Sequence, residues 1–107
     1  MTDLSSLCSH VVGEICATPE YRQYEETLKQ LKKDEPLFKR VTEYRERNFA
    51  LQQSDSEDLM DMLDALTNEY EDVINIELAS EFIEAEVALC RLIQNFQRDV
   101  IAGLNFE

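Results

Sequence analysis

The stretch from residue 78 to residue 104 limits what this chain can fold into more than any other. Apolar residues recur there at spacings of three, four or seven, which place them on one face of a helix. No proline interrupts the stretch, and its one glycine, Gly103, stands near its end. A stripe this wide needs more cover than one neighbouring helix provides. We therefore predict core or dimer-interface contacts for six residues of the stripe: Leu78, Phe82, Leu89, Ile93, Phe96 and Val100.

Shorter amphipathic stretches precede this one, and residues that start helices separate them. Thr18-Pro19 and Asp34-Glu35-Pro36 each place a capping side chain just before a proline that fits a first helical turn. Thr2 or Asp3 offers a similar cap at the start of the first stretch. The pattern predicts short connections between successive helices.

Helix boundaries are marked less clearly in the second half of the chain. Residues 52–56 are all polar and predict a loop. Ser54 and Glu57 have the spacing of a capping box, which predicts that the next helix starts there. The join near residues 75–77 lacks proline and glycine, so the sequence leaves open whether the two last helices are continuous. We predict an all-α protein, a five-helix bundle with long antiparallel helices, forming a single domain over residues 1–107. Heptad-like apolar spacings occur on the second, third and fourth predicted helices, and the last helix has a broad apolar face. Together they present more apolar surface than a compact monomer can bury, which predicts a homodimer.

The charge is distributed unevenly along the chain. Residues 1–53 carry 8 basic and 9 acidic side chains, whereas residues 54–107 carry 2 basic and 14 acidic ones. Direct nucleic acid binding is not expected, because it needs a concentrated basic surface. The acidic half suits protein partners with a basic patch, although a solvated face that keeps the domain soluble explains it equally well. Glu81, Glu84 and Glu86 are predicted to face solvent and are candidates for a partner face.

The sequence contains few residues suited to catalysis or metal binding. The one histidine, His10, has Glu14 one turn later, but two ligands do not make a zinc site. We expect no enzyme activity, no metal and no cofactor. Cys8, Cys16 and Cys90 are interpreted as small core residues with reduced thiols; the alternative is that one or two are ligands of a cluster shared with partner proteins.

Targeting and membrane signals are also missing from the sequence. The longest unbroken apolar run covers four residues, 87–90, and no basic segment followed by an apolar run stands at the N-terminus. We therefore expect a cytoplasmic protein with no membrane contact.

Several residues along the chain together resemble a known family pattern. They are Glu20, Tyr21, Tyr24, Leu28, Asp34, Pro36, Phe38, the run Glu-Phe-Ile-Glu-Ala-Glu at residues 81–86, Leu89, Ile93 and Ile101. This pattern is similar to the YlbF/YmcA family of bacterial regulators over about residues 4–101, and the run at 81–86 is its most specific part. Family members often carry Asn-Pro before the last helix, where this chain has Ile76-Glu77.

The resemblance implies an all-helical, commonly dimeric and non-enzymatic protein. Its best-studied members act in competence, sporulation and biofilm control, within a complex that adjusts the RNA-degrading endonuclease ribonuclease Y. Members of the iron–sulfur-binding complex have cysteines in a C-terminal extension, which this sequence lacks after Glu107. The resemblance favours a regulatory adaptor that binds other proteins. The alternative is a structural or chaperone-like helical homodimer without a dedicated partner.

Overall fold

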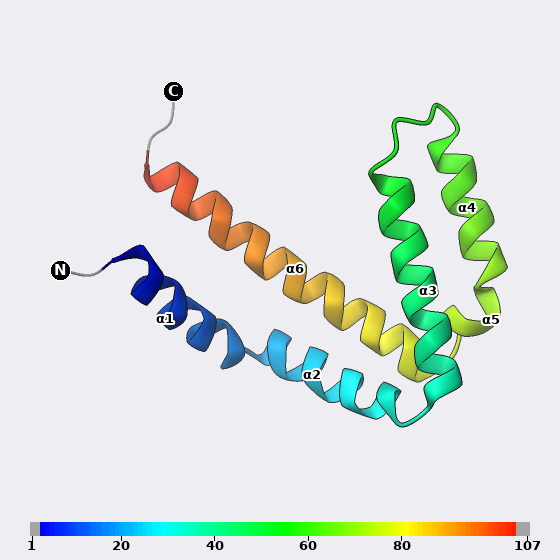
Figure 1. Cartoon of the computed structure of the whole chain (residues 1–107), viewed down its shortest axis with the longest axis horizontal. Coiled ribbons are helices and arrows are strands. Elements are labelled where there is room, and N and C mark those ends of the chain that lie inside the picture. The colour runs from blue at the N-terminus through cyan, green and yellow to red at the C-terminus, as the bar shows by residue number, and fades with distance from the viewer. Residues whose placement is uncertain (1–2, 105–107) are drawn as a thin grey trace. The chain divides into compact units, whose positions relative to one another are not determined.

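Six helices are present within residues 3–104, which is the part of the chain that the computed structural model describes (Figure 1). No strand occurs among these residues, so the all-helical prediction is confirmed. The helices are α1 (Leu4–Cys16), α2 (Pro19–Lys32), α3 (Glu35–Gln52), α4 (Leu59–Glu69), α5 (Glu71–Ile74) and α6 (Glu77–Gly103).

The first three helices begin where the sequence predicts. The Asp3 carboxylate accepts a hydrogen bond from the Ser6 backbone N–H at 2.7 Å, and this bond lowers the pKa of the carboxyl group. Thr18 Oγ1 accepts from the Tyr21 N–H at 3.2 Å at the start of α2, and Asp34 caps α3 in the same way. These caps pair amides that have no partner inside the helix.

The Thr18 cap gives a testable contribution to stability. Replacing Thr18 with Ala removes the acceptor for the first-turn amide of α2, and we expect the free energy of unfolding to fall by about 1 kcal/mol. Urea titration followed by circular dichroism measures the loss. Thr18→Ser keeps the acceptor and should retain most of the stability; a serine variant as weak as the alanine variant would contradict the capping role.

The start of α4 differs from the prediction. The helix begins at Leu59, and Ser54 instead donates a hydrogen bond to the Leu51 carbonyl oxygen at 2.7 Å, which closes the end of α3. Ser56 Oγ accepts from the Asp58 N–H at 3.2 Å inside the connecting loop. The predicted capping box of Ser54 and Glu57 is therefore wrong, because the serine side chain bonds backward along the chain.

The count of five helices is also wrong for this part of the chain. The backbone turns at Tyr70 and again at residues 75–76, and the four-residue helix α5 lies between the two turns. The Tyr70 carbonyl oxygen accepts hydrogen bonds from the N–H groups of Val73 and Ile74, both at 2.9 Å. A helix this short has no apolar period of its own, so the sequence pattern could not reveal it. The same turns show that α4 and α6 are not continuous.

Leu28–Glu81 forms one of two compact units of the chain, called unit 2 here. Within it, α3 packs against α4 and α5. The ring of buried Tyr70 lies 5.6 Å from that of Tyr44, and the guanidinium groups of Arg40 and Arg47 lie 5.1 and 5.5 Å from its centre. The buried apolar residues of unit 2 are Leu31, Leu37, Val41, Leu66, Tyr70, Val73 and Ala79.

The other compact unit, unit 1, comprises Met1–Thr27 and Phe82–Glu107. Among its described residues, buried side chains are limited to Thr27, Phe82 and Ala85. The Phe82 ring stacks on the Tyr24 ring with centroids 5.5 Å apart, and Thr27 donates its hydroxyl to backbone oxygens of its own helix. Unit 1 therefore has a small core for its length.

Candidate interaction surfaces

The six residues predicted to make core or dimer contacts divide into two groups along α6. Phe82 is fully buried, while Leu78 and Leu89 are half-buried. The three residues farther along the helix are exposed in the single chain: Ile93 by 37%, Phe96 by 44% and Val100 by 46%. The apolar stripe is thus covered at its start and open along its C-terminal half.

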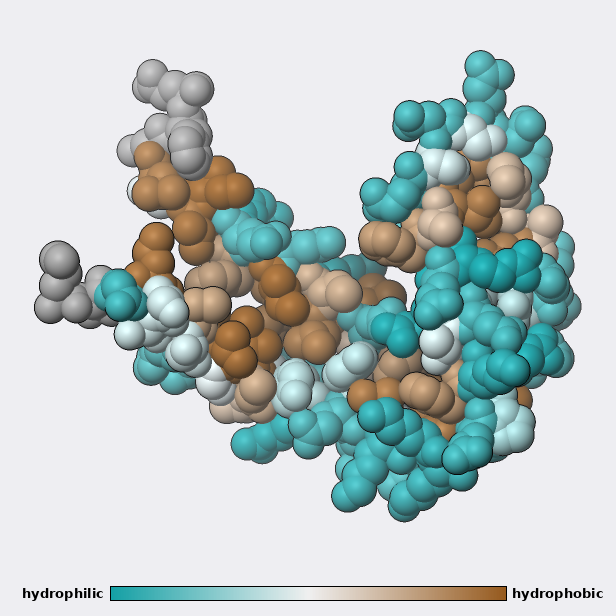
Figure 2. Space-filling model, in the orientation of Figure 1, coloured by the Kyte–Doolittle hydropathy of each residue, from teal (hydrophilic) through white to brown (hydrophobic). Residues whose placement is uncertain are grey.

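Helix α1 has an open apolar face of its own. All of its residues are described, and none of them is buried. Leu4 is 84% exposed, and other large apolar residues of α1 are exposed with it. Figure 2 shows apolar side chains gathered over α1 and the C-terminal half of α6. We call this set the α1–α6 apolar surface: Leu4, Leu7, Val12, Ile93, Phe96, Val100, Ile101 and Leu104.

A groove of about 500 Å³ adjoins this surface within unit 1. Ile15 of α1 and Glu20 of α2 line one side of the groove, and α6 lines the other with Phe96 among its residues. Arg91 and Asp99 add one charge of each sign. The groove therefore extends the apolar surface inward and has a mixed polar rim.

The three cysteines do not occupy core positions in the chain. Cys8, Cys16 and Cys90 are all exposed, so the prediction that they pack as small core residues is wrong here. The physical reason is that the helical stripes carrying them are not covered within unit 1. Negative charge on the Cys16 sulfur in its thiolate form, followed by that on Glu25, raises the pKa of the Tyr21 hydroxyl.

The candidate metal pair lies on the open surface of α1. His10 Nε2 is 3.8 Å from Glu14 Oε1, and both side chains are more than 70% exposed. Within residues 3–104, no three His, Cys, Asp or Glu side chains come together in a way that could hold a metal ion.

The acidic residues predicted to face solvent on α6 behave differently from one another. Glu81 and Glu84 are exposed, whereas Glu86 is half-buried. Glu86 follows Phe82 by four residues and precedes Leu89 by three, so the helical repeat places it beside the apolar stripe. The expectation that Glu86 lies mostly toward solvent is therefore wrong.

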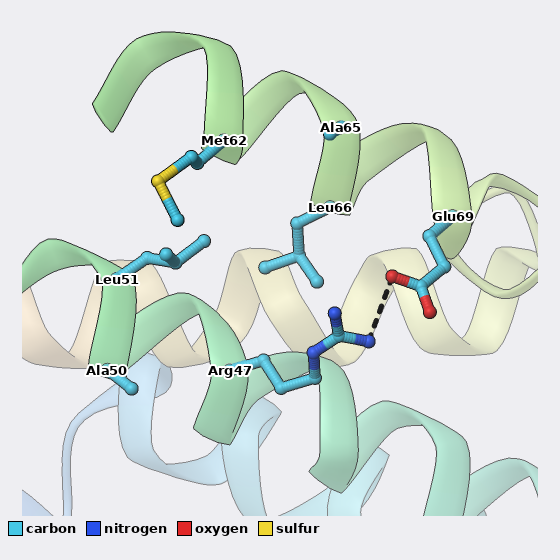
Figure 3. Close-up of a pocket in the computed structure, with 7 residues that line it drawn as sticks. All are labelled: Arg47, Ala50, Leu51, Met62, Ala65, Leu66 and Glu69. Carbon is cyan, nitrogen blue, oxygen red and sulfur yellow. Dashed lines mark ion pairs between the residues drawn. The ribbon is translucent and has the colours of Figure 1, made fainter. Parts of the chain in front are cut away.

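A second groove, of about 450 Å³, lies between α3 and α4 in unit 2 and was not anticipated from the sequence (Figure 3). The side chains of Leu51, Met62 and Leu66 point into it, and Ala50 and Ala65 leave room on facing helices. Small residues on two packed apolar faces are the signal that could have predicted it. We call it the α3–α4 groove; it is lined by Arg47, Ala50, Leu51, Met62, Ala65, Leu66 and Glu69.

An ion pair closes one end of the α3–α4 groove. Arg47 Nη1 lies 2.9 Å from Glu69 Oε2, and Arg47 also donates to the Tyr70 hydroxyl at 3.3 Å. The hydrogen bond to Glu69 is the main cause that raises the pKa of Arg47, and the same bond lowers the pKa of Glu69. Both groups therefore stay charged at neutral pH, and each neutralises the other.

No helix among residues 3–104 is long and apolar enough to span a membrane. The described structure defines an all-helical protein whose main surface features are an open apolar stripe, two grooves between helices and an acidic second half.

Comparison with known protein families identifies the family of this helical protein. Residues 8–105 match the family model described as "Control of competence regulator ComK, YlbF/YmcA". The match covers most of the chain, so the protein belongs to the YlbF/YmcA family, which is a regulatory family, and the resemblance predicted from the sequence is confirmed. No curated protein and no solved structure gives a significant match.

Proposed function

We propose that the chain is a cytoplasmic, non-enzymatic regulatory adaptor that works through protein–protein contacts as a homodimer. Membership of a regulatory family supports the regulatory part of this proposal. The observation that carries the protein-binding part is the exposed α1–α6 apolar surface. We further propose that units 1 and 2 act as one domain, since α2 and α6 each contribute residues to both.

The α1–α6 apolar surface comprises eight large apolar side chains, each at least 37% exposed in the single chain. Monomeric proteins rarely expose contiguous apolar patches above a few hundred Å², and larger ones mark interaction sites. A second copy of the chain would cover Ile93, Phe96 and Val100 with the same residues of its own α6. Such a two-fold contact gives the outer half of the stripe the cover that it lacks in one chain.

The acidic second half of the chain is the proposed region for contact with regulatory partners. Glu84 is exposed and lies two residues after buried Phe82, so it points about 200° around α6 from the buried side. Carboxylates on such a face attract a partner with a basic patch and speed its association. The family resemblance makes the machinery of ribonuclease Y the first candidate for such a partner.

Affinity capture from the native cell tests this function. We expect a stoichiometric protein partner whose binding weakens as salt rises, because salt screens charged contacts. Glu84→Lys should reduce capture while changing the free energy of unfolding by no more than about 0.5 kcal/mol, as is usual for an exposed position.

Asp64→Lys is the matched control, since Asp64 is an exposed acid on α4 and its reversal changes the net charge equally. An equal loss of capture in both variants would attribute binding to overall charge rather than to the Glu84 face. A dimer that captures no stoichiometric partner would instead support a structural or chaperone-like role.

A further inference from the structure

The α3–α4 groove has the geometry of a site for a helix. On α3, Ala50 and Leu51 lie three and four positions after Arg47, so the three residues share one helical stripe. On α4, Ala65 and Leu66 lie three and four positions after Met62, and Glu69 lies four after Ala65, so these residues form a second stripe. The two stripes face each other (Figure 3). Amphipathic helices bind proteins by placing an apolar face into a groove of this kind.

The apolar part of the groove is shaped to accept a side chain. Buried Leu66 lies between the two helices, while Ala50 and Ala65 are exposed and short. Met62 is 42% exposed, and its unbranched thioether adapts to partners of different shape. A large apolar residue can therefore enter between the two alanines against Leu51 and Leu66.

Acidic side chains surround this apolar part without being neutralised. Glu46, Asp58 and Asp61 each stand one helical turn before a groove residue, namely Ala50, Met62 and Ala65. All three are exposed, and none forms an ion pair with a basic group of the described chain. Residues 53–76 contain eight acidic residues and no lysine or arginine. Arg47 does not offset this charge, because Glu69 already pairs with it.

We propose that the α3–α4 groove binds a basic amphipathic helix of a partner protein. An apolar anchor of that helix enters between Ala50 and Ala65, and lysine or arginine residues flanking the anchor contact Glu46, Asp58 and Asp61. The inference rests on the proposed adaptor function and gives it a specific site and partner chemistry. It differs from the Glu84 face of α6 and from the α1–α6 apolar surface.

A second copy of the chain is a poorer occupant of this groove. The chain's own cluster of basic residues lies at Lys29, Lys32 and Lys33, at the end of α2. Leu31, the apolar residue inside that cluster, is fully buried and cannot act as an anchor for another molecule. The basic cluster of a second copy is therefore not the proposed occupant, and we assign the helix to a different protein.

A peptide titration of the full chain tests the groove directly. The chain has no tryptophan, so a synthetic leucine–lysine helix of about 18 residues with one central tryptophan reports its own burial by fluorescence. We expect a blue shift and saturable binding that weakens between about 50 and about 300 mM salt. A leucine–glutamate peptide of the same pattern should not bind, and binding of both peptides with equal affinity would overturn the proposal.

Groove variants locate the binding site. Ala65→Leu fills the space between the helices and should weaken peptide binding by at least about tenfold, while Asp61→Lys should weaken it by about threefold or more. Asp64→Lys should bind like the unchanged chain, because Asp64 stands one turn from Met60 and Asn68 rather than from a groove residue. Phe96→Asp should also leave peptide binding unchanged, since it alters the separate α1–α6 apolar surface.

The opposite results are equally informative. Unchanged binding by Ala65→Leu, or a loss of binding with Phe96→Asp, would overturn the groove assignment. Dissociation of a homodimer by Ala65→Leu, seen by light scattering, would make the groove a contact between copies and also overturn it. If Ala65→Leu lost the peptide but still captured the native partner in full, the helix-binding role would fail while the adaptor function stood.

Discussion

Phe82→Ala is expected to destabilise the chain more than any other single truncation in unit 1. The Phe82 side chain is 0% exposed, and its ring stacks on Tyr24 at 5.5 Å. Truncating a buried Phe to Ala removes its transfer energy and leaves a cavity, at a cost of about 3–5 kcal/mol. Because a domain is stabilised by only about 5–15 kcal/mol, the melting temperature should fall sharply. Thermal and urea unfolding followed by circular dichroism measure the loss.

Phe96→Ala is the matched control, because it makes the same chemical change on the same helix. Phe96 is 44% exposed in the single chain, so its truncation should cost much less when the protein is dilute. Phe82→Leu, which keeps most of the volume, should also cost less than Phe82→Ala. Equal losses of unfolding free energy from Phe82→Ala and Phe96→Ala in dilute solution would contradict the assignment of Phe82 to the buried part of α6 and Phe96 to its exposed part.

Helix starts could be predicted from the sequence because they depend on neighbouring residues. Asp3, Thr18 and Asp34 each bond to an amide three positions ahead, so the signal and its effect lie within four residues. The long apolar period of α6 is local in the same sense. The sequence placed this helix at residues 78–104, and the structure has it at Glu77–Gly103.

Which part of each apolar helix face is buried could not be predicted, because burial depends on residues far along the chain. The same three-and-four spacing carries buried Phe82 and exposed Phe96, and the sequence does not distinguish them. For this reason the spacing predicts core positions for Cys8, Cys16 and Cys90, whereas the structure shows all three exposed. An apolar stripe shows which face avoids water, but it does not show whether the same chain covers that face.

The α3–α4 groove was missed for a related reason. Ala50 and Ala65 are ordinary helical residues in the sequence, and they make a groove only because α3 and α4 pack side by side. The ion pair of Arg47 and Glu69 joins positions 22 residues apart, which no local pattern predicts. Glu86 is the opposite case: its four-residue spacing from Phe82 was available in the sequence and indicated partial burial.

Phe96→Asp is expected to convert a homodimer into a folded monomer. In the proposed dimer Phe96 leaves water on the outer half of the α6 stripe, and a carboxylate there would be buried without a partner. We expect the dimer dissociation constant to rise by about a hundredfold or more, the scale of a central interface residue. Light scattering at micromolar concentration should give twice the chain mass of 12.5 kDa for the unchanged protein and 12.5 kDa for the variant.

Because Phe96 is exposed in the single chain, this variant should affect dimer formation without affecting folding. Because a carboxylate at that site meets water once the dimer dissociates, the helical circular dichroism of Phe96→Asp should remain close to that of the unchanged chain. Glu84→Gln, which alters an exposed residue on another side of α6, should leave the dimer intact. A mass of 12.5 kDa for the unchanged protein would refute the homodimer, and the α1–α6 apolar surface would then be left for a different partner to cover.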